Sequence, residues 1–183
     1  MLEVDKTALL IIDVQDRLYR AMHEKEVLAE NIEKLIRGVR VLGIPVIATE
    51  QYPQGIGPTI PKIAPLLDGV PVTSKLSFSC CGDPAFLDAF TALNRKQVLI
   101  AGIECHVCVY QTTMDLLDRG HEVQIVADGV SSRTAWSRDI GLQKMRDEGA
   151  KITSTEIVLF ELLKSAGAAP FREISQIIKS EGR

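Results

Sequence analysis

The stretch Val98-Leu-Ile-Ala-Gly-Ile-Glu-Cys-His-Val-Cys-Val109 decides the fold and holds the first candidate for chemistry. The apolar run 98–102 is typical of a strand that is buried on both faces. Apolar residues then recur at three- and four-residue steps, as one face of a helix requires: Val107, Tyr110, Met114 and Leu117. Cys108 is therefore expected in or just before the first helical turn, where unpaired N–H groups and the helix dipole favour a thiolate.

The same alternation of apolar runs and helical patterns extends along the whole chain. Further strands are predicted at 7–13, 44–49, 70–74, 122–127 and 151–154, and helices at 24–42, 83–93, 136–148, 156–163 and 171–178. This alternation predicts an α/β fold of three layers, with six parallel strands in the common order 3-2-1-4-5-6 and helices on both faces. Residues 128–134 are expected to form a polar loop. Residues 50–68, rich in Pro and Gly, are expected to form an irregular pocket wall.

Length and composition limit the class of protein. The chain has 183 residues, of which 46% are hydrophobic, so we expect a single domain over 1–183 with a sizeable core. A net charge of −3 gives no attraction to nucleic acid or to an anionic membrane. The first residues lack the pattern of a signal peptide, and no apolar run approaches the roughly 20 residues that span a bilayer. We therefore expect a cytoplasmic protein with a small-molecule substrate and without structural disulfides.

Three ionisable residues follow buried strands of the predicted sheet. Asp13 ends the first strand, Lys75 comes directly after the third, and Cys108 follows the fourth. Since ligands bind outside the carboxyl ends of parallel strands, these side chains are expected to converge on one cleft. A carboxylate can take the proton of a thiol, and a nearby ammonium stabilises the charges of both. This trio predicts acyl transfer to sulfur followed by hydrolysis, as in amide cleavage.

Four segments together resemble the isochorismatase-like hydrolase family, which includes nicotinamidases and N-carbamoylsarcosine amidases. They occur in the order of the family and read Leu9-Leu-Ile-Ile-Asp-Val-Gln-Asp16, Thr73-Ser-Lys-Leu-Ser-Phe-Ser79, Gly102-Ile-Glu-Cys-His-Val-Cys-Val109 and Val126-Ala-Asp-Gly-Val-Ser-Ser-Arg133. The resemblance covers about residues 5 to 165. It implies a Rossmann-like fold and the catalytic triad Asp13, Lys75 and Cys108. It also implies homo-oligomers, dimers or larger, with apolar residues after Ala135 at an interface.

The resemblance assigns further roles around the cysteine. The oxyanion hole of the family, made of two backbone amides, would fall on Glu104 and Cys108, and its cis peptide bond on Ile103–Glu104. Pocket candidates are Gln15, Asp16, Tyr52, Phe78 and Cys105. No cofactor is expected.

Two departures from the family pattern narrow the activity. Nicotinamidases carry an Asp-x-His metal motif after the second strand, whereas this chain reads Thr49-Glu-Gln-Tyr-Pro53 and has no histidine between His23 and His106. No metal site is therefore expected. Isochorismatases proper lack the nucleophilic cysteine, so vinyl-ether hydrolysis is disfavoured. The chain looks most like the small-domain branch of the family, whose members are assigned only as hydrolases.

Other interpretations of the same residues remain open from sequence. Cys105 and Cys108 form a C-x-x-C pair, which is typical of thiol redox proteins. Cys108 alone could be a small buried side chain, Asp13 a cap and Lys75 a solvated loop residue. A ligand-binding or scaffolding homo-oligomer with the same fold and no turnover is the alternative from another class. Cys80 and Cys81 are expected to be structural.

Overall fold

Two fully buried strands form the centre of the sheet in the computed structural model, which describes residues 1–180. These are β1 (Thr7–Ile12) and β4 (Gln97–Ile103), which pair in parallel with Leu9 opposite Leu99. The sheet is completed by β2 (Val46–Gln51), β3 (Val72–Lys75), β5 (Glu122–Ser131) and β6 (Lys151–Thr153). All neighbouring strands are parallel in the order β3-β2-β1-β4-β5-β6. The predicted sheet and strand order are confirmed.

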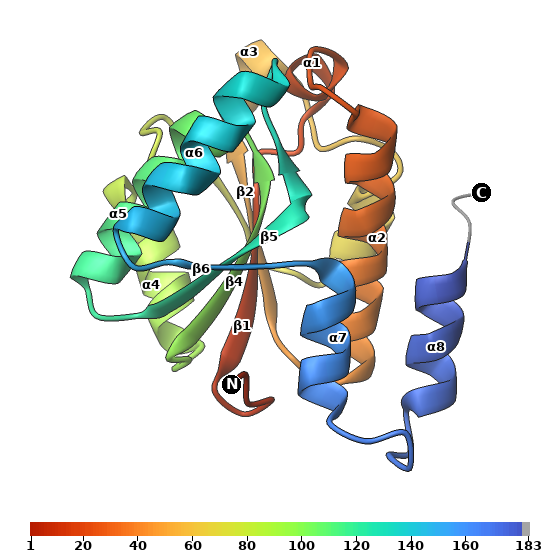
Figure 1. The fold of residues 1–183 in the computed structure, drawn as a ribbon. Coiled ribbons are helices and arrows are strands. Elements are labelled where there is room, and N and C mark those ends of the chain that lie inside the picture. Colours follow the sequence, from red (N-terminus) through yellow and green to blue (C-terminus); the bar gives the residue numbers. More distant parts are fainter. Residues whose placement is uncertain (181–183) are drawn as a thin grey trace.

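Helices cover both faces of this sheet (Figure 1). One face packs against α2 (Lys25–Val41) and α7 (Thr155–Leu163), and α8 (Phe171–Lys179) packs on the outer side of these two helices. The other packs against α4 (Pro84–Ala92), α5 (Tyr110–Asp118) and α6 (Ala135–Asp147). Successive strand residues alternate between the two cores, with Leu9 in the first and Leu10 in the second. No helix among residues 1–180 is long and apolar enough to cross a membrane.

The segment 128–134 is not a loop throughout, as we expected from its polar residues. Strand β5 continues to Ser131, because a register shift lets its second half pair again with the end of β4. Gly102 is then opposite Val130, and Ile103 is opposite Ser131. The backbone hydrogen bonds of this pairing outweigh the low strand propensity of Asp128 and Gly129.

The segment 50–68 is more regular than its Pro and Gly content suggests. Strand β2 runs on to Gln51, and the short helix α3 (Pro53–Ile56) and a 3₁₀ turn (Ala64–Leu67) follow. The short helix α1 (Asp16–Arg20), which the sequence did not predict, lies beside α3 at the carboxyl end of the sheet (Figure 1). An isolated antiparallel bridge between Gln15 and Thr59 fastens the segment to the residues that follow β1.

Candidate active site

The three predicted site residues lie at the carboxyl edge of the sheet. Asp13 comes directly after β1 in the left-handed region (φ 52°), and Lys75 is the last residue of β3. Cys108 belongs to a π-helical turn (Cys105–Val109) that connects β4 to α5. Gly102 allows β4 to pass close to β1 at this end, since it has a φ of 130° and a Cβ there would collide with the backbone of Ile12. The strand ends thus bring one carboxylate, one ammonium and one thiol to the same edge.

Asp13 and Lys75 form a fully buried ion pair. Lys75 Nζ donates a hydrogen bond to Asp13 Oδ2 at 2.7 Å, and neither side chain is exposed to solvent. Asp13 Oδ1 accepts a second hydrogen bond from Thr49 Oγ1 at 2.8 Å. Both carboxylate oxygens are therefore engaged, which fixes the plane of the carboxylate.

The Cys108 thiol completes the cluster and is protonated at neutral pH. Burial, together with the neighbouring Asp13 carboxylate, raises its pKa to about 12, although the charge of Lys75 acts in the opposite direction. The expectation that the helix start would favour a thiolate is therefore wrong for the resting site. The helix dipole is outweighed by burial and by a neighbouring carboxylate. A thiol that hydrogen-bonds a carboxylate can transfer its proton as it attacks.

The turn that carries Cys108 is tightly hydrogen-bonded. The Glu104 carbonyl accepts hydrogen bonds from the backbone N–H groups of Val107 at 3.0 Å and Val109 at 3.2 Å, and the Ile103–Glu104 peptide bond is cis. The Glu104 side chain pairs with Arg133, whose Nε lies 3.0 Å from Oε2. His106 Nδ1 is hydrogen-bonded to Ser132 Oγ at 2.9 Å. The side chains of Glu104 and His106 thus connect this turn to the two residues that follow β5.

The five pocket candidates take different positions. Tyr52 and Phe78 are half exposed, and the Phe78 carbonyl accepts a hydrogen bond from Lys75 at 3.1 Å. Gln15 is buried and donates to the backbone carbonyls of Gln51 and Gly57. Asp16 pairs with Arg20 on α1, and buried Cys105 donates to the Arg138 carbonyl. Asp16 and Cys105 therefore have their polar contacts away from the Asp13–Lys75 pair.

Three residues that contact or adjoin the cluster were not predicted. Thr49 and Gln51 end β2 and hydrogen-bond Asp13 and Lys75, respectively. Cys80 is buried with its Sγ 3.7 Å from Thr49 Oγ1, and the charges of Lys75 and Asp13 both act on its pKa, which burial raises to about 12. The sequence did carry a signal for Thr49 and Gln51, since both are polar and lie at the end of a strand that begins with apolar residues.

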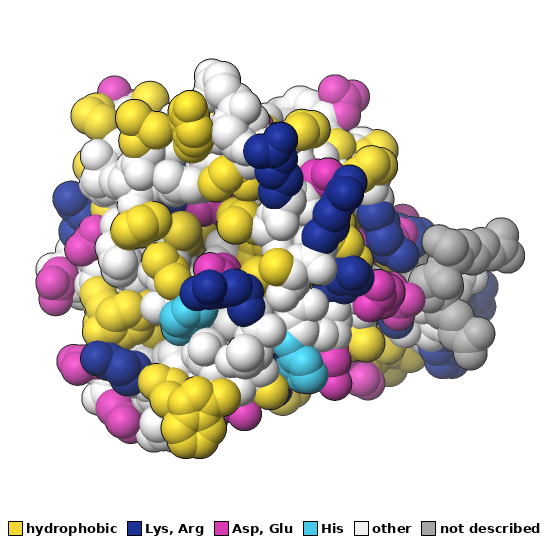
Figure 2. All heavy atoms as spheres, turned by 90° about the horizontal axis from the view of Figure 1, so that it is seen from above, with side chains coloured by type: hydrophobic (Ala, Val, Ile, Leu, Met, Phe, Trp, Pro, Cys, Tyr) yellow, Lys and Arg dark blue, Asp and Glu magenta, His cyan; other side chains and the backbone are white. Residues whose placement is uncertain are grey.

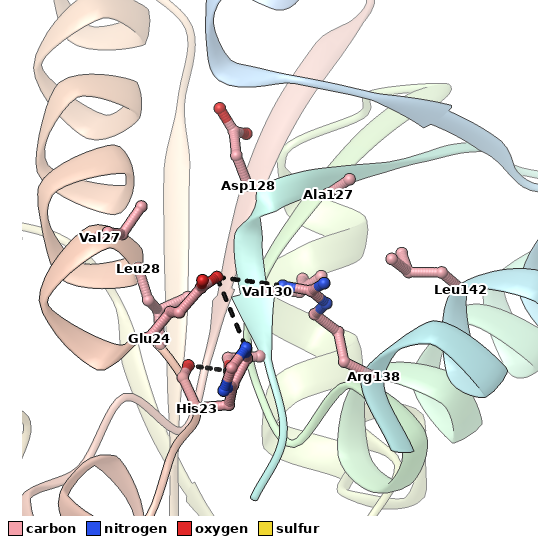
Figure 3. Close-up of a pocket in the computed structure, with 10 residues that line it drawn as sticks. His23, Glu24, Val27, Leu28, Ala127, Asp128, Val130, Arg138 and Leu142 are labelled. Carbon is pink, nitrogen blue, oxygen red and sulfur yellow. Dashed lines mark hydrogen bonds and ion pairs between the residues drawn. The ribbon is translucent and has the colours of Figure 1, made fainter. Parts of the chain in front are cut away.

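A hollow lies over the end of β5, away from this cluster (Figure 3). Its volume is about 280 Å³, and its walls come from the start of α2 and from α6. The Glu24 carboxylate lies 3.7 Å from His23 Nε2 and 3.6 Å from an Arg138 guanidinium nitrogen, and Arg138 also pairs with Asp139 at 3.0 Å. His23, Glu24 and Arg138 thus pair with one another, whereas Asp128 accepts hydrogen bonds from the backbone and side chain of Thr155. Asp13, Lys75 and Cys108 do not line it.

The residues also bear on metal binding. Within residues 1–180, no group of three or more His, Cys, Asp or Glu side chains is arranged to hold a metal ion. All four cysteines are free thiols: Cys80, Cys81, Cys105 and Cys108.

The fold and the edge cluster together define a doubly wound α/β protein with its polar site at the carboxyl ends of the strands. The model of the isochorismatase domain family matches residues 7–157. Isochorismatase domain-containing protein 2 of Danio rerio is 36% identical over 172 residues, which cover 94% of this chain and 86% of the relative. The chain belongs to the isochorismatase-like hydrolase family.

Solved structures agree with this assignment. The MAR1 ribonuclease of Caenorhabditis elegans is 34% identical and superposes with a TM-score of 0.90, covering 100% of this chain and 94% of the other. YcaC from Pseudomonas aeruginosa, solved with hexane-2,5-diol and covalent acrylamide, superposes with a TM-score of 0.92 at 24% identity, covering 97% and 89% of the two chains. The second comparison concerns the fold alone.

Proposed function

We propose that this protein is a cysteine hydrolase of a small amide or related acyl compound, with Cys108 as nucleophile. The observation that carries the proposal is the buried Asp13–Lys75 pair at 2.7 Å, with the Cys108 thiol close enough for both charges to act on its pKa. A buried ion pair is weak evidence for a purely structural role, because its desolvation offsets much of its attraction. A thiol, a proton acceptor and a fixed positive charge in one buried cluster suit nucleophilic catalysis.

In the first half of the reaction, Cys108 Sγ attacks the carbonyl carbon and its proton passes to Asp13. The carbonyl oxygen becomes an oxyanion, which the backbone amides of Glu104 and Cys108 stabilise as hydrogen-bond donors. The C–N bond then breaks, and Asp13 returns the proton to the leaving nitrogen. The products of this half are an amine and a thioester on Cys108.

In the second half, water attacks the thioester carbonyl and gives a proton to Asp13. The C–S bond breaks, the carboxylic acid leaves, and the proton returns to Cys108 Sγ. Lys75 stays charged throughout and stabilises first the carboxylate and then the developing thiolate. Apart from the attacking water, this cycle uses only side chains and backbone of the chain and needs no cofactor.

The experiment is turnover of a panel of small primary amides by the wild-type protein and by Cys108→Ala and Cys108→Ser. Turnover by the wild type with loss in both variants supports the proposal, and hydroxylamine should convert the trapped thioester into a hydroxamate. Cys105→Ala is the matched control, because Cys105 is also buried but donates to the Arg138 carbonyl. Full turnover by Cys108→Ala would refute the nucleophile.

A second candidate activity is RNA hydrolysis, which the name of the C. elegans neighbour suggests at 34% identity over the whole chain. The net charge of −3 disfavours it, since phosphate backbones are bound mainly by clustered Lys and Arg. Degradation of a single-stranded RNA by the wild type, lost in Cys108→Ala, would favour this activity over amide hydrolysis.

We also propose that the protein forms homo-oligomers. Trp136 and Ile140, one turn apart on α6, are 75% and 43% exposed. Figure 2 shows hydrophobic side chains gathered on the face where the strands end, among scattered Lys and Arg side chains. Large exposed apolar side chains in a group are typical of a contact surface.

A further inference from the structure

The Lys75 ammonium has four hydrogen-bond acceptors, and only one of them is charged. Besides Asp13 Oδ2 at 2.7 Å, Nζ lies 2.8 Å from Gln51 Oε1, 3.1 Å from the Phe78 carbonyl and 3.2 Å from the Ser77 carbonyl. The glutamine thus gives the shortest neutral contact. Its distance is close to that of the ion pair itself.

The orientation of the Gln51 amide is fixed at both ends. Oε1 accepts from Lys75, and Nε2 donates to the Leu76 carbonyl at 2.8 Å. Rotating the amide by half a turn would place its NH₂ group against the ammonium and its oxygen against a carbonyl. The acceptor is therefore presented to Lys75 before any reaction begins.

The backbone of Gln51 is held as firmly as its side chain. Its N–H donates to Gln15 Oε1 at 2.7 Å, and its carbonyl accepts from Gln15 Nε2 at 3.0 Å. The same Gln15 nitrogen donates to the Gly57 carbonyl at 2.7 Å, and Gln15 is fully buried. Gln15 thus fastens the end of β2 to the residues after β1 and to the segment that follows α3.

We propose that Gln51 is a positioning residue, which keeps the Lys75 ammonium in place while Asp13 carries the proton. The inference rests on the proposed function. When Asp13 takes the proton of Cys108, Lys75 loses the one charged acceptor among these four at the moment when its charge must stabilise the sulfur. A buried ammonium is disfavoured unless its N–H groups are well hydrogen-bonded, and the two backbone carbonyls are the longer contacts, at 3.1 and 3.2 Å. Gln51 Oε1, whose charge does not change, keeps the ammonium solvated through this step.

Alkylation of Cys108 by iodoacetamide tests this role without knowledge of the substrate. Rates are measured by peptide mass spectrometry between about pH 4 and pH 9, the range around the ordinary carboxyl and thiol pKa values. Gln51→Leu removes the acceptor and should slow alkylation about tenfold or more at the plateau of the profile, because a hydrogen bond to a charged group is lost. If Gln51→Leu does not unfold cooperatively, and so is not properly folded, Gln51→Met is used in its place, because methionine is closer to glutamine in length.

Gln51→Glu separates positioning from a structural role. It keeps an acceptor for Lys75 but loses the donor to the Leu76 carbonyl, as Gln51→Leu does. The plateau rate should return to within about threefold of the wild type, since only the charge-assisted bond is restored.

The matched control is Gln97→Leu. Gln97 is also buried, but its amide donates to the Met1 carbonyl and to Glu122 near the start of β4, so the alkylation profile should stay that of the wild type. Equal plateau rates for Gln51→Leu and the wild type would overturn the inference. A glutamate variant as slow as the leucine variant would also overturn it, by assigning the loss to the Leu76 contact.

Failure of the proposed function gives a different result. In that case the double variant Asp13→Asn with Lys75→Met, which leaves no unpaired buried charge, would alkylate at the wild-type rate. If this double variant is slow and both Gln51 variants match the wild type, the triad stands and only the role of Gln51 is refuted.

Discussion

Removal of the Lys75 charge should destabilise the fold far more than an ordinary surface substitution. In Lys75→Met the apolar stem of the side chain remains, but Asp13 loses its partner at 2.7 Å and keeps Thr49 Oγ1 as a hydrogen-bond donor. Gln51 Oε1 also loses its donor. Breaking a fully buried ion pair costs about 3–5 kcal/mol, and an unsatisfied buried acceptor adds to that. We therefore expect a loss of about 5 kcal/mol in the free energy of unfolding.

Urea titrations followed by circular dichroism measure this loss directly. With a slope of about 2 kcal/mol per molar urea, the transition midpoint should fall by about 2.5 M. The double variant Asp13→Asn with Lys75→Met leaves no buried charge in the pair. It should therefore recover most of the loss, because the two sites are in contact and their effects are not additive.

Two results would refute this reasoning. A loss below about 1 kcal/mol for Lys75→Met would mean that the pair is effectively solvated, as surface pairs are. A double variant whose loss equals the sum of the two single losses would mean that Asp13 and Lys75 act independently.

Three further predictions concern stability and assembly. Burial raises the pKa of Cys80 from 9.0 to about 12, so the folded state keeps its proton where the unfolded state loses it. Cys80 should therefore not affect the pH dependence of stability below about pH 8.5, and above it should contribute a fall of up to about 1.4 kcal/mol per pH unit, to which the other three buried thiols add. Urea titrations at rising pH should show a shallower fall for Cys80→Ala, and an unchanged fall would contradict the linkage. Gly102→Ala should lower the free energy of unfolding by about 3 kcal/mol, because the φ of Gly102 is 130° and the added Cβ would meet the Ile12 backbone. If this variant were as stable as the wild type in the same titration, β1 and β4 would have to move apart at this point without cost. Trp136→Ser should shift the sedimentation coefficient toward that of the monomer, and an unchanged oligomer would exclude α6 from the interface.

The strands and their order were predictable because β1, β2, β4 and β5 carry largely apolar runs that need burial on both faces, and parallel strands allow few connections. The same logic correctly placed Asp13, Lys75 and Cys108 at strand ends. The second half of β5 was missed because Asp128 and Gly129 are poor strand formers, and only the register shift against β4 gives their backbone a partner. Local sequence carries no information about that pairing.

The charge state of the site was harder to predict than its residues. The position of Cys108 near a helix start indicated a thiolate, whereas burial and the Asp13 carboxylate keep the thiol protonated. Gln51 was unrecognised because its role depends on the Lys75 side chain, which reaches it from the neighbouring strand β3. Such contacts follow from strand order and side-chain length together, and not from spacing along the chain.

The central claim is that Cys108 is the nucleophile that the Asp13–Lys75 pair serves. The most direct test is covalent labelling by an electrophilic acyl probe at neutral pH, with the modified residue located by peptide mass spectrometry. We predict one label on Cys108 in the wild type, the same label at the same rate in Cys105→Ala, and none in Cys108→Ala. Labelling that persists in Cys108→Ala and disappears in Cys105→Ala would contradict the account.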